Sequence, residues 1–232
     1  MKIGGLQKLT LIDYPNKVAA TVFLFGCNFR CPYCQNPELV DPEKVNNRQE
    51  ISEKEFFDFL DSKKGLIDGV CITGGEPTIH KELSDFIKKI KAKKFLVKLD
   101  TNGSNPEILK KLIDAKLLDF IAMDIKSSPE NYNKASGVKV DLKKIKKSIE
   151  IIKNSGIDYE FRITVVSGLV EEKDIEKIGK WLKGTKNFAL QQFQNKKVLD
   201  KSFEKIQPYP DEILKEFQKI LEKYIEKIEL RL

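Results

Sequence analysis

Histidine is almost absent from the sequence: His80 is the single histidine among 232 residues. Zinc sites built on several histidines and hydrolases with a Ser-His-Asp triad both need this residue, so its scarcity argues against both classes. Cysteine is also scarce. There are four, and three of them stand between positions 27 and 34. Such crowding favours a metal site or redox chemistry over a disulfide framework.

Long apolar runs are missing as well. The chain opens MKIGGLQKLT, without the stretch that a signal peptide or membrane anchor needs, so we expect a cytoplasmic protein with no membrane association. No repeat, low-complexity tract or linker interrupts the sequence. We therefore predict a single domain over residues 1–232, with a core at about 17–195 and a helical C-terminal extension at about 209–230.

No block of like charge stands alone, although Lys and Arg number 42 against 35 for Asp and Glu. The lysines alternate with glutamates in segments such as KEFQKILEKYIEK, which carry the apolar spacing of helices. This mixture favours solvated helix faces over a nucleic-acid surface, so a nucleic-acid partner is not expected.

Apolar, β-branched runs alternate with amphipathic segments along the chain. Strands are predicted at 18–26, 68–75, 95–103, 117–126, 158–168 and 187–193, and helices at 51–65, 78–94, 105–116, 141–156, 171–184 and 211–228. Alternating units of this kind predict an α/β fold with a parallel sheet and helices packed outside it. The pattern alone allows an open doubly wound sheet or a partial barrel.

Unusual polar residues follow the predicted strands. GGE follows the second strand, DTNG the third, MDIK ends the fourth and LQQFQ ends the sixth, while the cysteines follow the first. Because ligands of parallel α/β folds bind at the carboxyl ends of strands, we expect these groups to form one site.

The cysteines Cys27, Cys31 and Cys34 have the spacing Cys-x3-Cys-x2-Cys. Three thiolates on a [4Fe–4S] cluster leave one iron open to a small molecule, whereas structural clusters and zinc sites ordinarily take four protein ligands. A zinc site completed by His80 or water is the less favoured alternative. Cys71 lies in an apolar strand and is expected in the core rather than as a fourth ligand.

With these motifs the sequence resembles the radical S-adenosylmethionine superfamily. It is most similar to the glycyl-radical-enzyme activases, and among them to the activating proteins of anaerobic ribonucleoside-triphosphate reductase. The resemblance extends from LTLIDYPNKVAATVFLFGCNFRCPYC to the LQQF strand. It implies a partial (β/α)6 barrel of the TIM type, a [4Fe–4S] cluster on Cys27, Cys31 and Cys34, and S-adenosylmethionine as cofactor.

The resemblance also carries over residues of the cofactor pocket. By this likeness Gly74, Gly75 and Glu76 of GGEP receive the methionine amino group, and Lys126 pairs with the cofactor carboxylate. Asp100 and Asp124 hold the ribose or a monovalent cation beside that carboxylate. For Arg162, a place near the cofactor and a structural ion pair both remain open. The full expected set for the cofactor is Tyr33, Gly74, Gly75, Glu76, Asp100, Asn102, Asp124, Lys126, Arg162 and Gln194.

Three positions depart from the family. Asn16 stands where glycine is common in DYPG, and asparagine tolerates the left-handed turn expected there. Gln35 follows the last cysteine where histidine is common, and Gln194 stands where relatives carry histidine or arginine. His80 matches no family role, and we expect it on a helix surface.

The implied activity is radical chemistry. Reductive cleavage of S-adenosylmethionine gives a 5′-deoxyadenosyl radical, which takes hydrogen from a glycine of a partner enzyme, here an anaerobic ribonucleotide reductase large subunit. The electron would come from a donor such as flavodoxin or ferredoxin. Two alternatives stay open: a compact radical enzyme of the deazaguanine-synthase type acting on a small molecule, and a non-enzymatic zinc-binding module.

Overall fold

The computed structural model describes residues 1–41 and 50–232. Within these ranges one sheet of eight strands runs in the order β1-β2-β3-β4-β5-β6-β7-β8. Strand β1 pairs antiparallel with β2, and every later neighbour is parallel. The strands are β1 (Ile3–Thr10), β2 (Ala19–Leu24), β3 (Gly69–Gly74), β4 (Leu96–Thr101), β5 (Phe120–Asp124), β6 (Asp158–Val165), β7 (Thr185–Gln192) and β8 (Ile225–Arg231).

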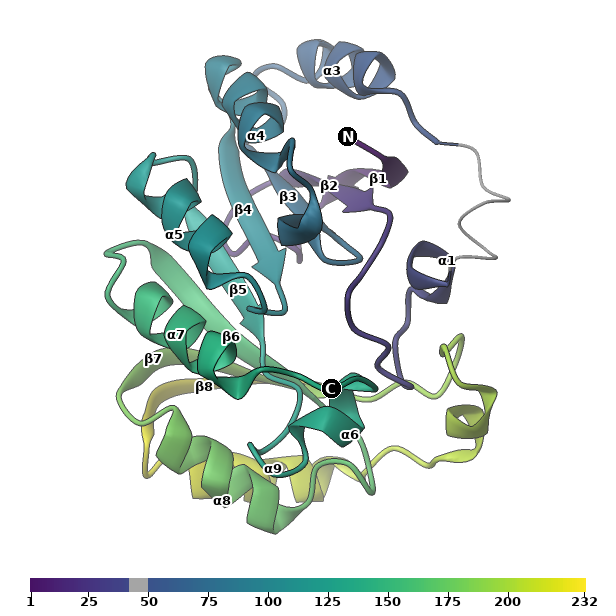
Figure 1. Cartoon of the computed structure of the whole chain (residues 1–232), viewed down its shortest axis with the longest axis vertical. Helices are drawn as coiled ribbons and strands as arrows, with labels where there is room; N and C mark the ends of the chain where they lie inside the picture. The colour runs from purple at the N-terminus through teal and green to yellow at the C-terminus, as the bar shows by residue number, and fades with distance from the viewer. Residues whose placement is uncertain (42–49) are drawn as a thin grey trace.

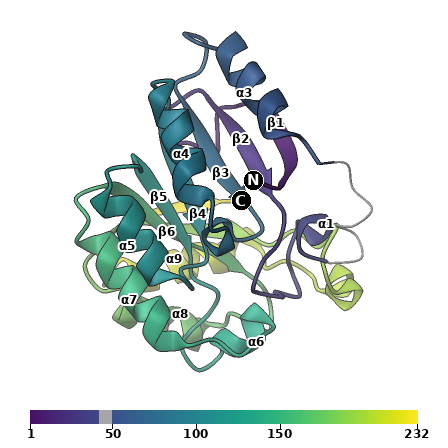
Figure 2. The ribbon, with the colours of Figure 1, turned by 45° about the horizontal axis from the view of Figure 1, so that its top comes forward.

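Helices join the strands and lie outside the curved sheet (Figures 1 and 2). The α-helices are α1 (Pro37–Val40), α3 (Glu53–Ser62), α4 (Leu83–Ala92), α5 (Pro106–Asp114), α6 (Tyr132–Ser136), α7 (Leu142–Lys153), α8 (Glu172–Trp181) and α9 (Asp211–Leu221). In the part of the chain that the structure describes, two 3-10 turns span η1 (Pro77–Ile79) and η2 (Lys201–Lys205). No helix in the described part of the chain is long and apolar enough to cross a membrane.

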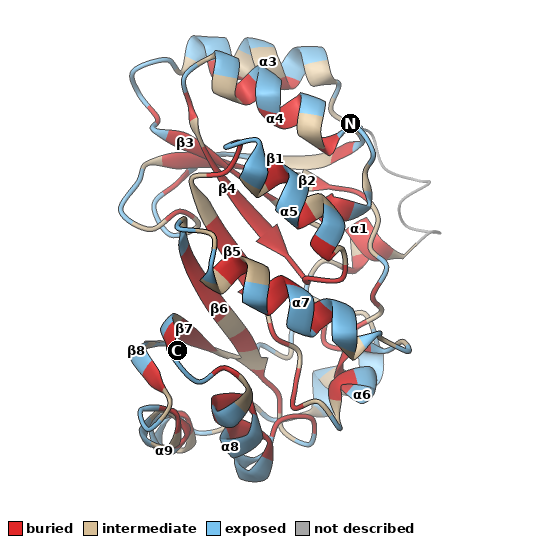
Figure 3. Cartoon of the chain, turned by 60° about the vertical axis from the view of Figure 1, so that its left-hand side comes forward, coloured by how far each residue is buried: buried red, intermediate tan, exposed pale blue. Residues whose placement is uncertain are grey.

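The core lies between the sheet and the inner faces of these helices. Figure 3 shows buried positions along the central strands and on one side of each covering helix. Helix α4 illustrates the cause: Leu83, Phe86, Ile87 and Ile90 recur at helical spacing and are all buried. Burial of each such side chain stabilises the fold by roughly 1.5–3 kcal/mol.

The sequential strand order decides between the two architectures that the sequence left open. A doubly wound sheet reverses its strand order at a switch point, whereas here each strand neighbours the next one in the chain. Strands β1 and β8 are the two ends of this order, so the described sheet is a partial barrel rather than a closed one.

The prediction of a helix over 211–228 was wrong in its second half. Helix α9 ends at Leu221, and Ile225–Arg231 form strand β8, which pairs parallel with β7. The pairing satisfies backbone groups along β7 and buries Ile225, gains that local helical spacing does not reveal. The helical extension at 209–230 is therefore a helix followed by an edge strand. Strand β1 was not predicted at all.

His80 also lies elsewhere than expected. The helix predicted from residue 78 is interrupted, because η1 ends at Ile79 and α4 begins at Leu83. His80 follows η1, is half-buried, and places its Nε2 2.8 Å from the carbonyl oxygen of Phe25. Burial lowers the pKa of this imidazole. It ties η1 to the end of β2 instead of facing solvent from a helix.

Candidate active site

A cavity of about 580 Å³ opens at the carboxyl ends of the parallel strands. All thirteen residues expected at the site line it, although they come from the cysteine loop and from positions in or after five different strands. They are Cys27, Cys31, Tyr33, Cys34, Gly74, Gly75, Glu76, Asp100, Asn102, Asp124, Lys126, Arg162 and Gln194. The expectation that the strand-end motifs gather in one place is met.

The cysteine loop follows β2 and is held by one bond within the loop and by two neighbouring segments. Its Arg30 donates from Nη1 to the Cys27 carbonyl at 2.6 Å, and the Arg30 amide donates to Ser136 of α6 at 2.9 Å. On the other side, the Asp200 amide donates to the Pro32 carbonyl at 2.9 Å. Figure 1 shows this loop running between α6 and the segment after β7. The thiols are thus anchored by segments distant in sequence.

The three thiols of the loop are half-buried or buried and free of disulfides. Burial raises the pKa of Cys27 to about 12 and that of Cys31 to about 11, and it raises the pKa of Cys34 too. The protein alone therefore keeps these groups as thiols at neutral pH. Metal uptake must displace their protons, because thiolates are the ligands.

The cysteines do not converge on a single point. Among the described residues, no three His, Cys, Asp or Glu side chains are arranged to hold one metal ion. Ligands of a cubane cluster bind separate irons, so they need only share a cavity wall, as these three do.

The glycines after β3 bring two backbones together. A Cβ on Gly75 would lie 1.7 Å from the Gly26 carbonyl oxygen, and one on Gly74 would lie 2.4 Å from the Leu24 amide. The Gly75 amide donates to the Leu24 carbonyl and the Glu76 amide to that of Gly26, both at 2.8 Å. Glycine is needed here because the end of β3 packs directly on the start of the cysteine loop.

Glu76 is 1% exposed and joins the ends of β3 and β4. Its carboxylate accepts from the Asn102 amide at 2.6 Å, the Thr101 hydroxyl at 2.7 Å and the Thr78 amide at 3.1 Å. Burial raises the pKa of Glu76 despite these bonds. The carboxylate thus has protein partners of its own, and its contact with a cofactor ammonium remains a prediction.

Charged side chains on β4, β5 and β6 form a continuous row. Arg162 donates from Nη2 to Asp100 at 3.0 Å and from Nε to Asp124 at 2.5 Å, and Lys126 lies 3.0 Å from the other Asp124 oxygen. Although burial opposes ionisation, Arg162 and its lysine neighbours hold the pKa values of both carboxyl groups below their usual range. Arg162 is therefore part of an ion-pair row on the cavity wall, as one of the two alternatives predicted, and its place near the cofactor stays a prediction.

Tyr33 and Gln194 complete the expected set. Tyr33 is buried, and its hydroxyl has no hydrogen-bond partner among the described residues. Gln194 is exposed at the rim, and its carbonyl accepts from the Gln35 side chain at 3.0 Å. The two glutamines that depart from the family are thus joined to each other.

Sequence reasoning missed residues that act across strands. Asn28 accepts from Asn102 at 2.9 Å and donates to Ser104 at 2.8 Å, which links the cysteine loop to β4. Arg231 of the unpredicted strand β8 lines the cavity and pairs with Glu160 at 2.7 Å. Neither belongs to a recognisable motif, so only the folded chain reveals them. Lys98 is a third case, buried on β4 beside Asp100.

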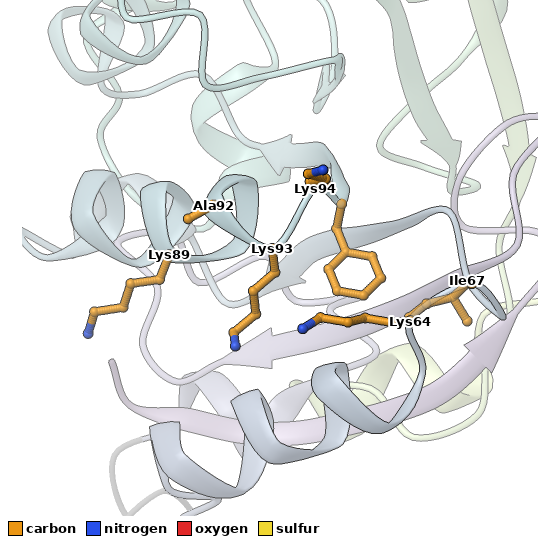
Figure 4. A pocket seen from close by; sticks show the side chains of 8 residues that line it. Lys64, Ile67, Lys89, Ala92, Lys93 and Lys94 are labelled. Carbon is orange, nitrogen blue, oxygen red and sulfur yellow. The ribbon is translucent and has the colours of Figure 1, made fainter.

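A second hollow of about 860 Å³ lies at the opposite, amino-terminal end of the strands. Lys89 and Lys93 point from α4 toward α3 there (Figure 4), where Lys89 pairs with Glu53 and Lys93 with Asp61. Lys89 and Lys93 are thus engaged in ion pairs between two helices, and the hollow is separate from the strand-end cavity.

Comparison with known proteins gives a consistent picture. The model of the radical SAM superfamily matches residues 21–182. A Methanocaldococcus jannaschii protein, provisionally named a glycyl-radical enzyme activating enzyme, is 35% identical over 234 residues, covering 99% of this chain and 95% of the relative. The pyruvate formate-lyase-activating enzyme of Clostridium pasteurianum is 26% identical over 196 residues, which cover 80% of this chain and 78% of that enzyme.

The fold has solved counterparts too. A domain of the pyruvate-formate lyase-activating enzyme from Bacteroides vulgatus matches with a TM-score of 0.56 and 21% sequence identity, covering 69% of this chain and 98% of that domain. This likeness supports the architecture alone.

Proposed function

The chain belongs to the radical SAM superfamily, among its glycyl-radical-enzyme activating members, and on that premise we propose that it forms a glycyl radical on a partner enzyme. The observation that carries the proposal is the convergence of three cysteines and the ten residues expected around the cofactor on one cavity. We propose the large subunit of an anaerobic ribonucleotide reductase as the partner, on the similarity of the motifs across the chain.

The residues present fit the cofactors of the family. Cys27, Cys31 and Cys34 would hold a [4Fe–4S] cluster with one open iron, and the strand-end residues would hold S-adenosylmethionine. Tyr33 also lines the cavity, and its buried hydroxyl has no hydrogen-bond partner among the described residues. When bound, the two groups supply one-electron reductive cleavage of a sulfonium and abstraction of a hydrogen atom.

The protein's own part is to bind and orient the cofactor and to supply charged side chains on the cavity wall. Lys126 and Arg162 would present cationic groups to the carboxylate of the cofactor, and both side chains are held by ion pairs with Asp124. Because these side chains are already held by ion pairs, they need not reorganise when the ligand binds. Neither a histidine nor another acid or base is required.

The electron donor we propose is a flavodoxin or ferredoxin, and the site of action the cytoplasm, where thiols stay reduced. A monovalent cation beside the cofactor carboxylate was a further expectation.

The test is to incubate the reconstituted protein, reductant and S-adenosylmethionine with the reductase under anaerobic conditions. A doublet-type glycyl radical signal should appear by electron paramagnetic resonance, and it should be absent with Cys31→Ala. Cofactor cleavage without a protein radical would refute the activase role and favour a small-molecule substrate. Zinc without iron or sulfide in anaerobically purified protein would refute radical chemistry altogether.

A further inference from the structure

Lys98 has no role in the function proposed above, yet its position is unusual. It lies in the middle of β4 in an otherwise apolar run and is 2% exposed. A buried lysine is costly unless it is paired. Its ammonium is bonded to Asp100 and lies 3.8 Å from the Cys71 sulfur and 5.9 Å from the centre of the Phe120 ring.

The spacing on β4 explains the pair. Residues two apart on a strand point to the same face, so Lys98 and Asp100 both face the barrel interior. Asp100 lines the cavity, whereas Lys98 is not among the lining residues and lies behind it. Burial disfavours the charged amine, but Asp100 outweighs this and holds the pKa of Lys98 above its usual value.

Lys98 begins the row of charges on the cavity wall. The order is Lys98, Asp100, Arg162, Asp124 and Lys126, with the signs alternating along it. Three cations face two carboxylates, so the row carries one net positive charge. Without Lys98 the row would be neutral, and the only cation of the row left beside Asp100 would be Arg162, which Asp100 already shares with Asp124.

We propose that the Lys98 ammonium is a built-in counter-cation for Asp100, which does the work that a bound monovalent ion would otherwise do. It leaves Arg162 and Lys126 in place for an anionic ligand group and makes ligand binding independent of potassium or sodium. Lys98 is a positioning residue that acts through Asp100. The identity of the ligand rests on the proposed function, but the counter-cation role can be tested without it.

The first experiment uses the protein without added ligand. The melting temperature of wild type and of Lys98→Met is compared in potassium chloride and in tetramethylammonium chloride at equal ionic strength. A cation that binds only the folded variant should raise its melting temperature by about 3 °C or more, while wild type should not respond. Lys91→Met is the matched control, because it removes a lysine paired with Asp119 on the outer layer.

The second experiment measures S-adenosylmethionine binding to the reconstituted protein by calorimetry. Wild type should bind equally in both salts. Lys98→Met should bind S-adenosylmethionine about tenfold or more weakly in tetramethylammonium, and its affinity should recover in potassium. A general packing defect would lower the affinity equally in both salts, so the difference between the salts identifies the counter-cation role. The double variant Lys98→Met/Asp100→Asn, which lacks both charges, should lose the dependence on potassium.

Failure of the counter-cation role and failure of the proposed function give different results. A wild type that needs potassium, a Lys98→Met variant that is indifferent to it, or a double variant that still responds would each overturn the counter-cation. If Lys98→Met folds in neither salt, the double variant becomes the test. The proposal then requires that the double variant folds and that its melting temperature does not depend on potassium. If wild type binds no S-adenosylmethionine in either salt, the proposed function fails, and the melting experiment still judges Lys98.

Discussion

The four cysteines of the chain differ in what surrounds them. Cys71 is fully buried within β3, next to the Lys98 ammonium, while Cys27, Cys31 and Cys34 line the cavity. Burial raises the pKa of Cys71 as well. A high thiol pKa therefore does not distinguish the three expected cluster ligands from Cys71. The difference between them is that the three ligands line the cavity and Cys71 does not.

Single substitutions should separate the two kinds of cysteine. Cys27→Ala is expected to abolish cluster assembly, because two thiolates cannot hold the cubane, and iron and sulfide content with the visible absorbance report this. Cys71→Ala should retain the cluster and lose about 1–2 kcal/mol of stability from the small cavity left in β3. Full iron content in Cys27→Ala, or its loss in a folded Cys71→Ala, would contradict the ligand assignment.

At the scale of elements, the junction between β3 and the cysteine loop leaves no room for a side chain. A methyl group at Gly75 would overlap the Gly26 carbonyl, and both partners are backbone. At Gly5 of β1 a Cβ would meet only the Phe23 side chain, at 3.5 Å, an ordinary contact. Neither glycine has a positive φ, so the two positions differ in space rather than in backbone conformation.

Gly75→Ala should therefore cost about 1–3 kcal/mol of stability by overpacking and should also lower cluster content, since the loop must move. Gly5→Ala should stay within about 0.5 kcal/mol of wild type. Urea unfolding of the protein without cluster gives the first quantity and iron analysis after reconstitution the second. Equal behaviour of the two variants would mean that the junction relaxes freely.

The helices and strands predicted correctly from the sequence were those whose apolar residues follow one clear pattern, either helical spacing or a continuous apolar run. The six apolar strands and the helices between them fall where continuous apolar runs or helical spacing placed them, except that the helix predicted from residue 78 begins only at Leu83. The edge strands did not: β1 is half-exposed and opens with glycines, and β8 mixes charged and apolar residues after a helix of the same composition. Their strand conformation comes from pairing with β2 and β7, which is information outside the segment itself.

For the molecule as a whole, the sequence identified which residues gather but not how they are joined. The cysteine spacing and the strand-end motifs predicted the cavity wall. The bonds of Arg162 to two carboxylates, of Glu76 to β4 and of Asn28 to Asn102 link different strands, so no local pattern contains them. Lys98 escaped notice because a lysine in an apolar run signals nothing until its partner is known.

The ion-pair row should also govern the stability of the whole molecule in acid. In the unfolded chain Asp100 and Asp124 take up protons near pH 4, while in the fold their lowered pKa values keep them ionised. The unfolded state then binds more protons, so the free energy of unfolding is highest above about pH 5 and falls as the pH drops through 4 toward the folded pKa values. Asp124→Asn removes one of these groups and should flatten the slope of unfolding free energy against pH between 5 and 3, as measured by urea unfolding. Asp114→Asn, at an exposed carboxylate on α5, is the comparison variant and should keep the wild-type slope; an unchanged slope in Asp124→Asn would show that the row does not control acid stability.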